Sequence, residues 1–418
     1  MDQTLSNTLR AVCAEPYGFW LDSALPYRRL GTRSFWGADP AIILRSDCGR
    51  IEIERRHGPT ERLTGDPFEV LRALLDERKG KGAAVGYLGY GLKRHLERLP
   101  DRAADDLGLP ECHIAFYDRV HVIDPRALAP PLPVLGLPPV LDGLRSTFTR
   151  EAYEAAVRRA LGYIRAGDIY QVNLSQRFEA FCQRDEFDTY LRLRAQAPAP
   201  FAAFLRYPGY VVMSCSPERF LRYDPERRLV ETRPIKGTRP RGPGPRSDRA
   251  LADELLASAK DRAENVMIVD LERNDLGRVA EVGSVRVTAL CELESFPSVH
   301  HLTSTVVARL RADRDIVDLL RAAFPGGSVT GAPKIRAMQI IDELEPVARG
   351  VYTGAIGYIE PGGGMDLNVA IRTVVAKNGT AWFHVGGGIV ADSDPAQEYE
   401  ETLHKGAALA RALVGEGP

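Results

Sequence analysis

The chain has 418 residues, enough for two or three ordinary domains or for one large body with a subdivided core. Its formal net charge is −1, so it lacks the global positive field expected of a nucleic-acid-binding protein. Six cysteines lie scattered without a C-x-x-C pair, which argues against structural zinc and against a disulfide scaffold. The N-terminus has no signal-peptide pattern and the chain no apolar run of 18 residues, so we expect a soluble cytoplasmic protein without membrane association.

Residues 1–128 form the first predicted region, which is strand-rich. Ala41–Arg45 and Ile51–Glu54 are predicted strands around a turn, and Phe68–Arg78 has the apolar spacing of a helix. The apolar, glycine-punctuated run Gly82–Tyr90 predicts a buried strand and a bend. Leu128–Pro139 is rich in proline and predicts a linker or a surface crossing.

Residues 149–414 form the second predicted region. Thr149 is a predicted N-cap, followed by an apolar helical stripe and a strand at Ile169–Leu174. Turn sequences at 224–227 and 378–379 predict two hairpins. Further helices are expected at 248–258, 259–274, 315–323, 333–344 and 395–413. Hairpins interleaved with helices favour an α+β fold with largely antiparallel sheets.

The stretch Glu231–Gly242 surrounds a single lysine, Lys236, with three arginines, Arg233, Arg239 and Arg241. Neighbouring cations disfavour the charged form of a lysine, and this is one way to make it nucleophilic. The alternative is a basic surface loop that grips anions.

Two pairs of acids are predicted on helix faces at i, i+3 spacing: Asp261 with Glu264, and Glu398 with Glu401. If the two pairs converge, their oxygen ligands suit Mg²⁺. The alternative is a solvated face on which Glu401 pairs with Lys405 at i, i+4.

Two glycine-rich segments could present backbone N–H groups to an anion. Gly386, Gly387 and Gly388 follow a predicted strand directly, and Gly326–Lys334 leads into a helix without matching a P-loop. A packing bend explains the first segment equally well.

Isolated polar residues also stand in apolar surroundings. Glu218 and His301 are candidates for acid–base chemistry, although a lone histidine in such a run is more often a satisfied core residue. Arg372 is predicted within an apolar strand, where an arginine usually has a carboxylate partner from the protein or a ligand. Tyr352 lies between Val351 and Thr353, where a core role is the simpler interpretation.

These segments together resemble the chorismate-utilising enzymes, and within them most closely the component I chains of aminodeoxychorismate synthases. An N-terminal resemblance covers Phe19–Pro26 and Ser34–Pro40. The other similar runs extend over almost all of residues 150–412: Gly167–Phe178, Ser214–Phe220, Thr232–Gly242, Lys260–Gly277, Val299–Ser304, Phe324–Asp342, Gly350–Tyr358, Asp366–Thr373 and His384–Thr402. The fold that the resemblance implies is an antiparallel β-sandwich flanked by helices, like that of anthranilate synthase component I.

Lys236 is the discriminating residue within this family. Anthranilate synthases carry alanine there, whereas a lysine resembles the covalent nucleophile of the aminodeoxychorismate enzymes. The resemblance then implies that Lys236 attacks C2 of chorismate, that Glu218 protonates the departing 4-hydroxyl, and that His301 positions or polarises that hydroxyl or the ring. Ammonia adds at C4 and the lysine departs, giving 4-amino-4-deoxychorismate, a precursor of 4-aminobenzoate and folate.

The resemblance also implies ligands and partners. Glu264, Glu398 and Glu401 would hold Mg²⁺ against the ring carboxylate of chorismate, with Asp261 nearby. Many relatives have the longer glutamate at position 261, so the contact of Asp261 with the metal is expected to run through water. Ser328 would lie at the ring carboxylate. The enolpyruvyl carboxylate would be held by Arg372, Tyr352 and the amides of Gly386, Gly387 and Gly388.

The chain has no G-x-C-x-G nucleophile motif of a glutamine amidotransferase, so a separate subunit is expected to supply ammonia. The rival functions are an anthranilate synthase component I or isochorismate-type synthase, in which Lys236 is incidental, and a non-catalytic chorismate-binding subunit.

Overall fold

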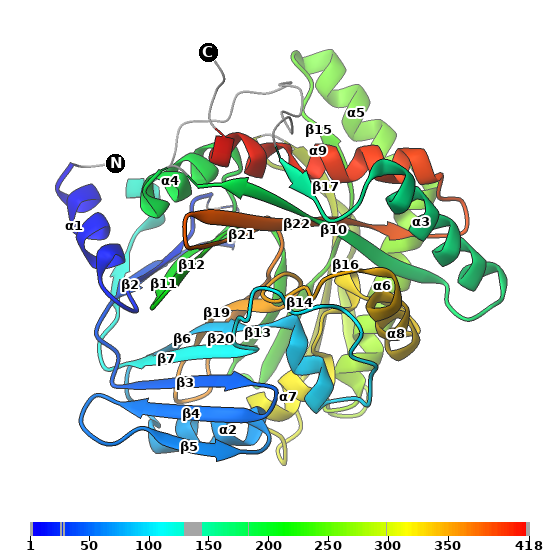
Figure 1. Ribbon diagram of the computed structural model, residues 1–418. Coiled ribbons are helices and arrows are strands. Elements are labelled where there is room, and N and C mark those ends of the chain that lie inside the picture. The colour runs from blue at the N-terminus through cyan, green and yellow to red at the C-terminus, as the bar shows by residue number, and fades with distance from the viewer. Residues whose placement is uncertain are drawn as a thin grey trace.

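The computed structural model describes residues 3–25, 27, 30–128, 144–182, 184–297 and 299–414. Two large β-sheets lie face to face, and helices cover their outer faces (Figure 1). Each strand pair within them is antiparallel, as Phe19–Asp22 against Phe201–Tyr207 illustrates. The α+β sandwich expected from the sequence is therefore confirmed.

The first sheet has ten strands within the described residues, and β9 (Arg145–Ser146) pairs with β10 beside the main path. In spatial order the main path is β18 (Gly331–Ala332), β10 (Gln171–Phe181), β22 (Thr380–Ile389), β21 (Thr373–Lys377), β12 (Tyr210–Ser216), β11 (Phe201–Tyr207), β1 (Phe19–Asp22), β2 (Ser34–Gly37) and β8 (His121–Ile123).

The second sheet has twelve strands in the same described part of the chain, with β16 (Arg286–Ser295) pairing with β17 beside the main path. The main path is β15 (Ile235–Pro240), β17 (Val299–Arg309), β14 (Leu229–Arg233), β13 (Arg219–Asp224), β20 (Met365–Val369), β19 (Ala355–Ile359), β6 (Ala83–Leu88), β7 (Cys112–Tyr117), β3 (Ile42–Asp47), β4 (Arg50–Arg55) and β5 (Glu61–Thr64). Both sheets thus combine strands from residues 1–128 and from residues 149–414.

Helices form the two outer layers. The first sheet is covered by α1 (Gln3–Ala14), α3 (Arg150–Arg165), α4 (Glu186–Gln196) and α9 (Pro395–Val414), and α8 (Lys334–Leu344) packs on β10. The second sheet is covered by α2 (Pro67–Glu77), α5 (Pro245–Ala257), α6 (Ala259–Gly277) and α7 (Ile316–Ala323). Short 3-10 turns are η1 (Tyr90–His95), η2 (Pro125–Leu128) and η3 (Gly327–Val329).

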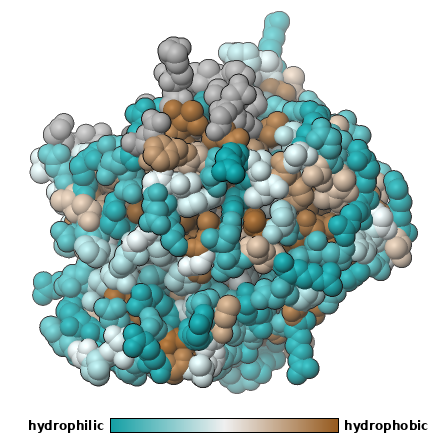
Figure 2. Space-filling view, in the orientation of Figure 1, coloured by the Kyte–Doolittle hydropathy of each residue, from teal (hydrophilic) through white to brown (hydrophobic). Residues whose placement is uncertain are grey.

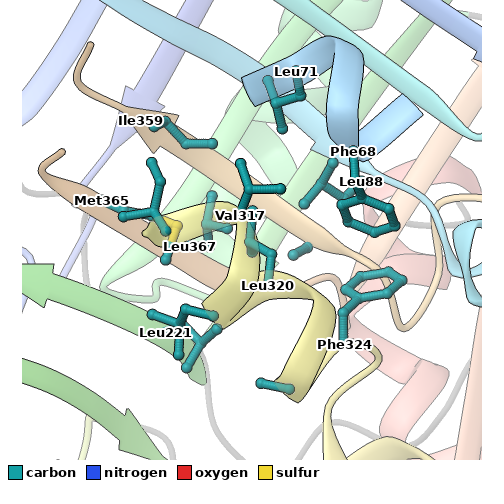
Figure 3. Packing of buried hydrophobic residues seen from close by; sticks show 14 of the residues in the cluster. Phe68, Leu71, Leu88, Leu221, Val317, Leu320, Phe324, Ile359, Met365 and Leu367 are labelled. Carbon is teal, nitrogen blue, oxygen red and sulfur yellow. The ribbon is translucent and has the colours of Figure 1, made fainter. Parts of the chain in front are cut away.

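Separate hydrophobic clusters hold these layers together. Leu21, Leu205 and Val85 belong to the cluster between the two sheets. Outside the second sheet, Phe68 of α2 and Val317 of α7 belong to another cluster, which Figure 3 shows at close range. Polar residues cover most of the surface seen in Figure 2, with hydrophobic residues scattered among them. Within the described residues, no helix is both long and apolar enough to cross a membrane.

The predicted hairpins and helices agree closely with the structure. Strands β13 and β14 pair, as do β21 and β22, and the helices expected from residue 248 onward are all present. Helices α1 and α4 were not predicted, and β10 extends well beyond Leu174. Residues 129–139 of the proposed linker lie outside the described residues.

Candidate active site

The glycine run of β22 brings the two acidic helices together. A Cβ atom on Gly387 would lie 3.1 Å from Glu398 Oε2, 3.7 Å from Glu401 Oε1 and 3.9 Å from Lys405 Nζ, all from α9. Because glycine carries no side chain, these charged groups can stand directly over the strand. The run therefore serves as the floor of a charged site.

Helix α6 reaches the same floor one residue further along. A Cβ atom on Gly388 would lie 3.5 Å from Glu264 Oε2 and 2.4 Å from the Gln171 amide nitrogen of β10. Gln171 is 1% exposed, and neither atom of its amide has a hydrogen-bond partner among the described residues. A buried amide without partners indicates a place where another molecule completes the hydrogen bonds.

The backbone of the glycine run has one edge available. Gly386, Gly387 and Gly388 pair with Ser175, Leu174 and Asn173 of β10. On the other edge, the pairing with β21 ends at Phe383, so no described strand pairs with the glycines there. No described strand uses the backbone groups on that edge, although the Gly386 oxygen accepts a hydrogen bond of 3.0 Å from Lys405.

Lys236 of β15 points into this site. Its ammonium group donates a hydrogen bond of 3.1 Å to the backbone oxygen of Ser328 in η3. Burial lowers the pKa of Lys236 and the cation Lys405 lowers it further, whereas Glu264, Glu218 and Glu401 act in the opposite direction. The lysine is therefore easier to deprotonate than an exposed one.

The cause of that shift differs from the sequence-based interpretation. Arg233 pairs with Glu294 at 2.7 Å, Arg239 with Glu254 at 2.7 Å and Arg241 with Asp248 at 2.6 Å. Each arginine is thus neutralised by a carboxylate of its own, and none of the three is among the described groups that chiefly shift the pKa of Lys236. The idea that three crowding arginines activate Lys236 was wrong; burial is the main cause.

Glu218 precedes β13 and is 4% exposed. Burial raises the pKa of Glu218 to about 7, although the Ser328 hydroxyl and Lys236 pull the pKa down. Its Oε1 atom has no hydrogen-bond partner among the described residues. Near neutral pH this carboxyl can hold a proton and give it up, which is the requirement for a general acid.

His301 of β17 is buried and its Nδ1 atom lies 2.9 Å from the Thr238 hydroxyl. Burial lowers the pKa of His301 to about 3, so the imidazole is neutral at physiological pH. A neutral imidazole can orient a substrate or form a hydrogen bond with it, but it cannot donate a proton as an imidazolium ion does.

Arg372 does not lie within a strand, which corrects the sequence-based placement. It follows β20, precedes β21 and has φ of 49°, a left-handed backbone conformation uncommon for arginine. Within the described part of the chain, its guanidinium forms no hydrogen bond or ion pair, and burial lowers its pKa. An arginine without a protein carboxylate is a candidate anion-binding group.

Tyr352 lies under the site and is 6% exposed. Its ring stacks on His384 of β22, with ring centroids 5.0 Å apart and planes 11° apart. The Nε2 atom of His384 has no hydrogen-bond partner among the described residues. This stack adjoins the start of the glycine run, so Tyr352 combines a core position with access to the site.

Three of the four acids in the proposed magnesium set form an ion pair with a cation from the chain itself. Asp261 pairs with Arg239 at 3.2 Å, Glu401 with Lys405 at 2.6 Å, and Glu398 with Lys260 at 3.6 Å. The alternative pairing of Glu401 with Lys405 is therefore present. Among the described residues, no three histidine, cysteine or acidic side chains stand close enough to hold one metal ion.

The chemistry of the acids nevertheless suits a hard divalent cation. Burial raises the pKa of both Glu264 and Glu398, and Glu398 adds to the shift at Glu264 through repulsion. Converging carboxylates with raised pKa values are relieved by a cation placed between them. Ligation would require them to turn from their present partners.

Three residues of the site were missed by sequence reasoning as contributors to it. Lys405 was considered only as a surface partner of Glu401, yet it also donates a hydrogen bond of 3.0 Å to the Gly386 backbone oxygen. Gln171 and His384 occupy inward positions on long buried strands. A polar residue at a buried strand position was the sequence signal that could have identified Gln171 and His384 as site residues.

Comparison with known proteins extends these observations. Residues 39–411 match the family model for a chorismate binding enzyme. Aminodeoxychorismate synthase component 1 of Salmonella typhimurium is 42% identical over 412 residues, covering 92% of this chain and 89% of that protein. Anthranilate synthase component 1 of Thermus thermophilus is 45% identical over 363 residues, covering 79% of this chain and 77% of that protein.

The fold is shared as well. The crystal structure of anthranilate synthase component I from Streptococcus pneumoniae superposes with a TM-score of 0.79 at 33% sequence identity, covering 93% of this chain and 94% of that chain. Overall identity does not separate the two named activities, because both kinds of relative are similar to a comparable degree. The extent of the match establishes that the chain belongs to the family of chorismate binding enzymes and has the fold of anthranilate synthase component I.

Proposed function

We propose that this chain is a component I of aminodeoxychorismate synthase, which aminates chorismate at C4 through a covalent bond to Lys236. The observation that carries the proposal is the lysine itself. Lys236 is partly buried, its pKa is lowered, and Glu218, whose pKa of about 7 permits proton donation, is one of the charged groups that act on it. The named aminodeoxychorismate relatives support the same activity.

The reaction is a double displacement. Neutral Lys236 Nζ bonds to C2 of chorismate, the ring double bonds shift, and the C4–O bond breaks. Glu218 gives its proton to the departing hydroxyl, so that water leaves. Ammonia then bonds to C4, the double bonds shift back, and the C2–N bond breaks to release Lys236 as a neutral amine. The new ammonium group loses a proton, which returns to the Glu218 carboxylate. The net change is chorismate plus ammonia to 4-amino-4-deoxychorismate plus water, and two easier steps replace one difficult substitution.

The positively charged groups of the site would bind the two carboxylates of chorismate. Arg372 has no protein carboxylate partner among the described residues. It would hold the enolpyruvyl carboxylate together with Tyr352 and the backbone of Gly386, Gly387 and Gly388, one edge of which pairs with no described strand. Lys405 adds a second cation. His301, being neutral, would orient the ring or the 4-hydroxyl without competing for the proton of Glu218.

Glu264, Glu398 and Glu401 would hold Mg²⁺, with Asp261 nearby. A bound Mg²⁺ would supply positive charge to the ring carboxylate, where the Ser328 hydroxyl is a further hydrogen-bond donor. Glu398 and Glu401 lie over Gly387 and Glu264 lies over Gly388, so these three carboxylates would hold the cation beside the glycine run. Ammonia would come from a glutamine amidotransferase subunit.

Product identification tests the proposal. The chain is incubated with chorismate, MgCl₂ and excess ammonium at mildly alkaline pH, and products are separated by chromatography and identified by mass. We expect 4-amino-4-deoxychorismate. Anthranilate or isochorismate as the main product would contradict the assignment and favour the rival synthases, and binding of chorismate without turnover would favour a non-catalytic subunit.

A further inference from the structure

Lys260 occupies an unusual position for a lysine. It is the second residue of α6, whose N-cap Ser258 accepts a hydrogen bond from the Asp261 amide at 3.2 Å. The N-terminus of a helix carries partial positive charge, so a cation in the first turn is locally unfavourable. A contribution to helix stability therefore does not explain a lysine at position 260. The interactions of Lys260 with groups outside the helix do explain it.

The ammonium group of Lys260 crosses from α6 to α9. It lies 3.6 Å from Glu398 Oε1, and the Glu398 side chain is 4% exposed whereas that of Lys260 is 48% exposed. The positive charge of Lys260 lowers the pKa of Glu398, Glu264 and Glu401, three of the acids in the proposed magnesium set. One exposed ammonium group thus offsets the negative charge of a partly buried cluster of carboxylates from the solvent side.

Lys405, the other lysine of the cluster, is held more firmly. It forms an ion pair of 2.6 Å with Glu401 and a hydrogen bond of 3.0 Å to the Gly386 backbone oxygen. Lys260 forms only the longer ion pair with Glu398, and its side chain makes no hydrogen bond in the described part of the chain. Of the two, Lys260 is the cation that can leave without breaking other contacts.

We propose that Lys260 is the built-in counter-cation of the acid cluster: its ammonium group neutralises Glu398 and Glu264 in the metal-free chain and moves into solvent when a divalent cation takes its place. This rests on the magnesium site in the proposed function. Lys260 thereby sets the affinity for the metal, because binding must first displace it. It also prevents repulsion among the acids from destabilising the metal-free chain.

The test is a titration with MgCl₂ alone, followed by calorimetry, on wild type and Lys260→Gln. We expect Lys260→Gln to bind Mg²⁺ about 1.5- to fivefold more tightly, the range that one partly screened ion pair can contribute. Lys260→Arg keeps the charge and should resemble wild type. Lys79→Gln, an exposed lysine outside the site, is the matched control.

Thermal unfolding provides a second readout that does not depend on activity. Without metal, Lys260→Gln should melt below wild type, and saturating MgCl₂ should raise its melting temperature by more than it raises that of wild type. An equal or weaker affinity of Lys260→Gln for Mg²⁺ would overturn the role of Lys260 alone. Failure of wild type and variant alike to bind Mg²⁺ would overturn the magnesium site itself, and with it this inference.

Discussion

Lys236, which is partly buried, and Glu218, which is buried, have pKa values that shift toward each other. Burial lowers the pKa of Lys236 and raises that of Glu218 to about 7, since it disfavours the charged form of each. A neutral amine and a protonated carboxyl in one site are the states that nucleophilic attack and proton donation require. Both shifts thus favour the protonation states that the first step requires.

The pH dependence of the rate should reveal Glu218. Because a general acid must be protonated, the wild-type rate should fall as the pH rises above about 7, the pKa of Glu218. Glu218→Gln should lower the rate about 10²- to 10⁴-fold and remove this alkaline decline. Rate–pH profiles of both variants check this, with the exposed Glu226→Gln as control. An alkaline decline that persists in Glu218→Gln would assign it to another group.

A second buried carboxyl should affect stability. Glu272 is 7% exposed, accepts a hydrogen bond of 2.8 Å from the Thr232 hydroxyl, and burial raises its pKa from 4.5 to about 8. Between these two pKa values the folded chain keeps a proton that the unfolded chain has lost. The stabilising contribution is therefore complete below the unfolded pKa and is lost as the pH rises through the folded pKa.

Glu272→Gln, which stays neutral, should gain stability relative to wild type as the pH rises from about 4.5 to about 8, at about 1.4 kcal/mol per pH unit as an upper limit. Urea unfolding at pH 5 and pH 9 measures the gap. Equal gaps at the two pH values would show that Glu272 has an ordinary pKa.

At the residue scale, the sequence singled out Lys236, Glu218 and the acids as candidates but did not predict their environment. The pKa of Lys236 depends on burial and on Lys405, which is far along the chain. The adjacent arginines were the visible neighbours in sequence, yet all three are paired elsewhere. Side-chain orientation decides such effects, and sequence spacing does not report it.

The element that organises the site is the glycine run of β22. A Cβ atom on Gly386 would lie 2.6 Å from the Leu174 backbone oxygen, whereas one on Gly387 would meet only the ends of flexible side chains, the nearest at 3.1 Å. Backbone cannot yield as a side chain can. The two adjacent glycines are therefore required for different reasons, one for folding and one for the site.

We expect Gly386→Ala to destabilise the fold by about 1–3 kcal/mol, as overpacking in a core does. Gly387→Ala should leave stability within about 1 kcal/mol of wild type but displace Glu398 and reduce activity and magnesium affinity. Chemical unfolding and rate measurements on both variants separate the two effects. A loss of stability in Gly387→Ala as large as in Gly386→Ala would contradict this division.

At the element scale, capping and periodicity predicted most helices well. Ser258 and Asp394 cap α6 and α9 as their sequences indicate. Helix α4 was missed although Asp185 caps its N-terminus and the helix residues Phe187 and Tyr190 are buried. Helix α1 was missed although Leu5 and Leu9 form an i, i+4 stripe against the first sheet. In both, the signals were present but short.

The whole molecule places the site between elements that are distant in sequence. Lys236 comes from the second sheet, the glycine run from the first, and the acids from helices on the outer layers of both. Because both sheets mix strands from the two ends of the chain, the site's geometry depends on the complete sandwich. This strand order requires pairing between strands that are distant in sequence, and hydrophobic periodicity does not encode such pairing. The sandwich was therefore predicted from the family resemblance and not from periodicity.

At the scale of the whole chain, the sequence bears on where the ammonia comes from. Since the sequence has no G-x-C-x-G nucleophile motif, the chain alone should form product with ammonium but not with glutamine. Adding a glutamine amidotransferase subunit of the same pathway should confer glutamine-dependent activity. Product formed by the chain alone from glutamine as fast as from ammonium would contradict a separate ammonia donor.

The most direct test of the role of Lys236 is the rate at which Lys236→Ala forms 4-amino-4-deoxychorismate from chorismate, MgCl₂ and ammonium. Covalent catalysis by Lys236 predicts a loss of about 10³-fold or more, with the fold and the binding of chorismate retained. The exposed Lys79→Ala should behave as wild type. An unchanged rate in Lys236→Ala would contradict the covalent mechanism and leave Lys236 as only a neighbour of the true catalytic groups.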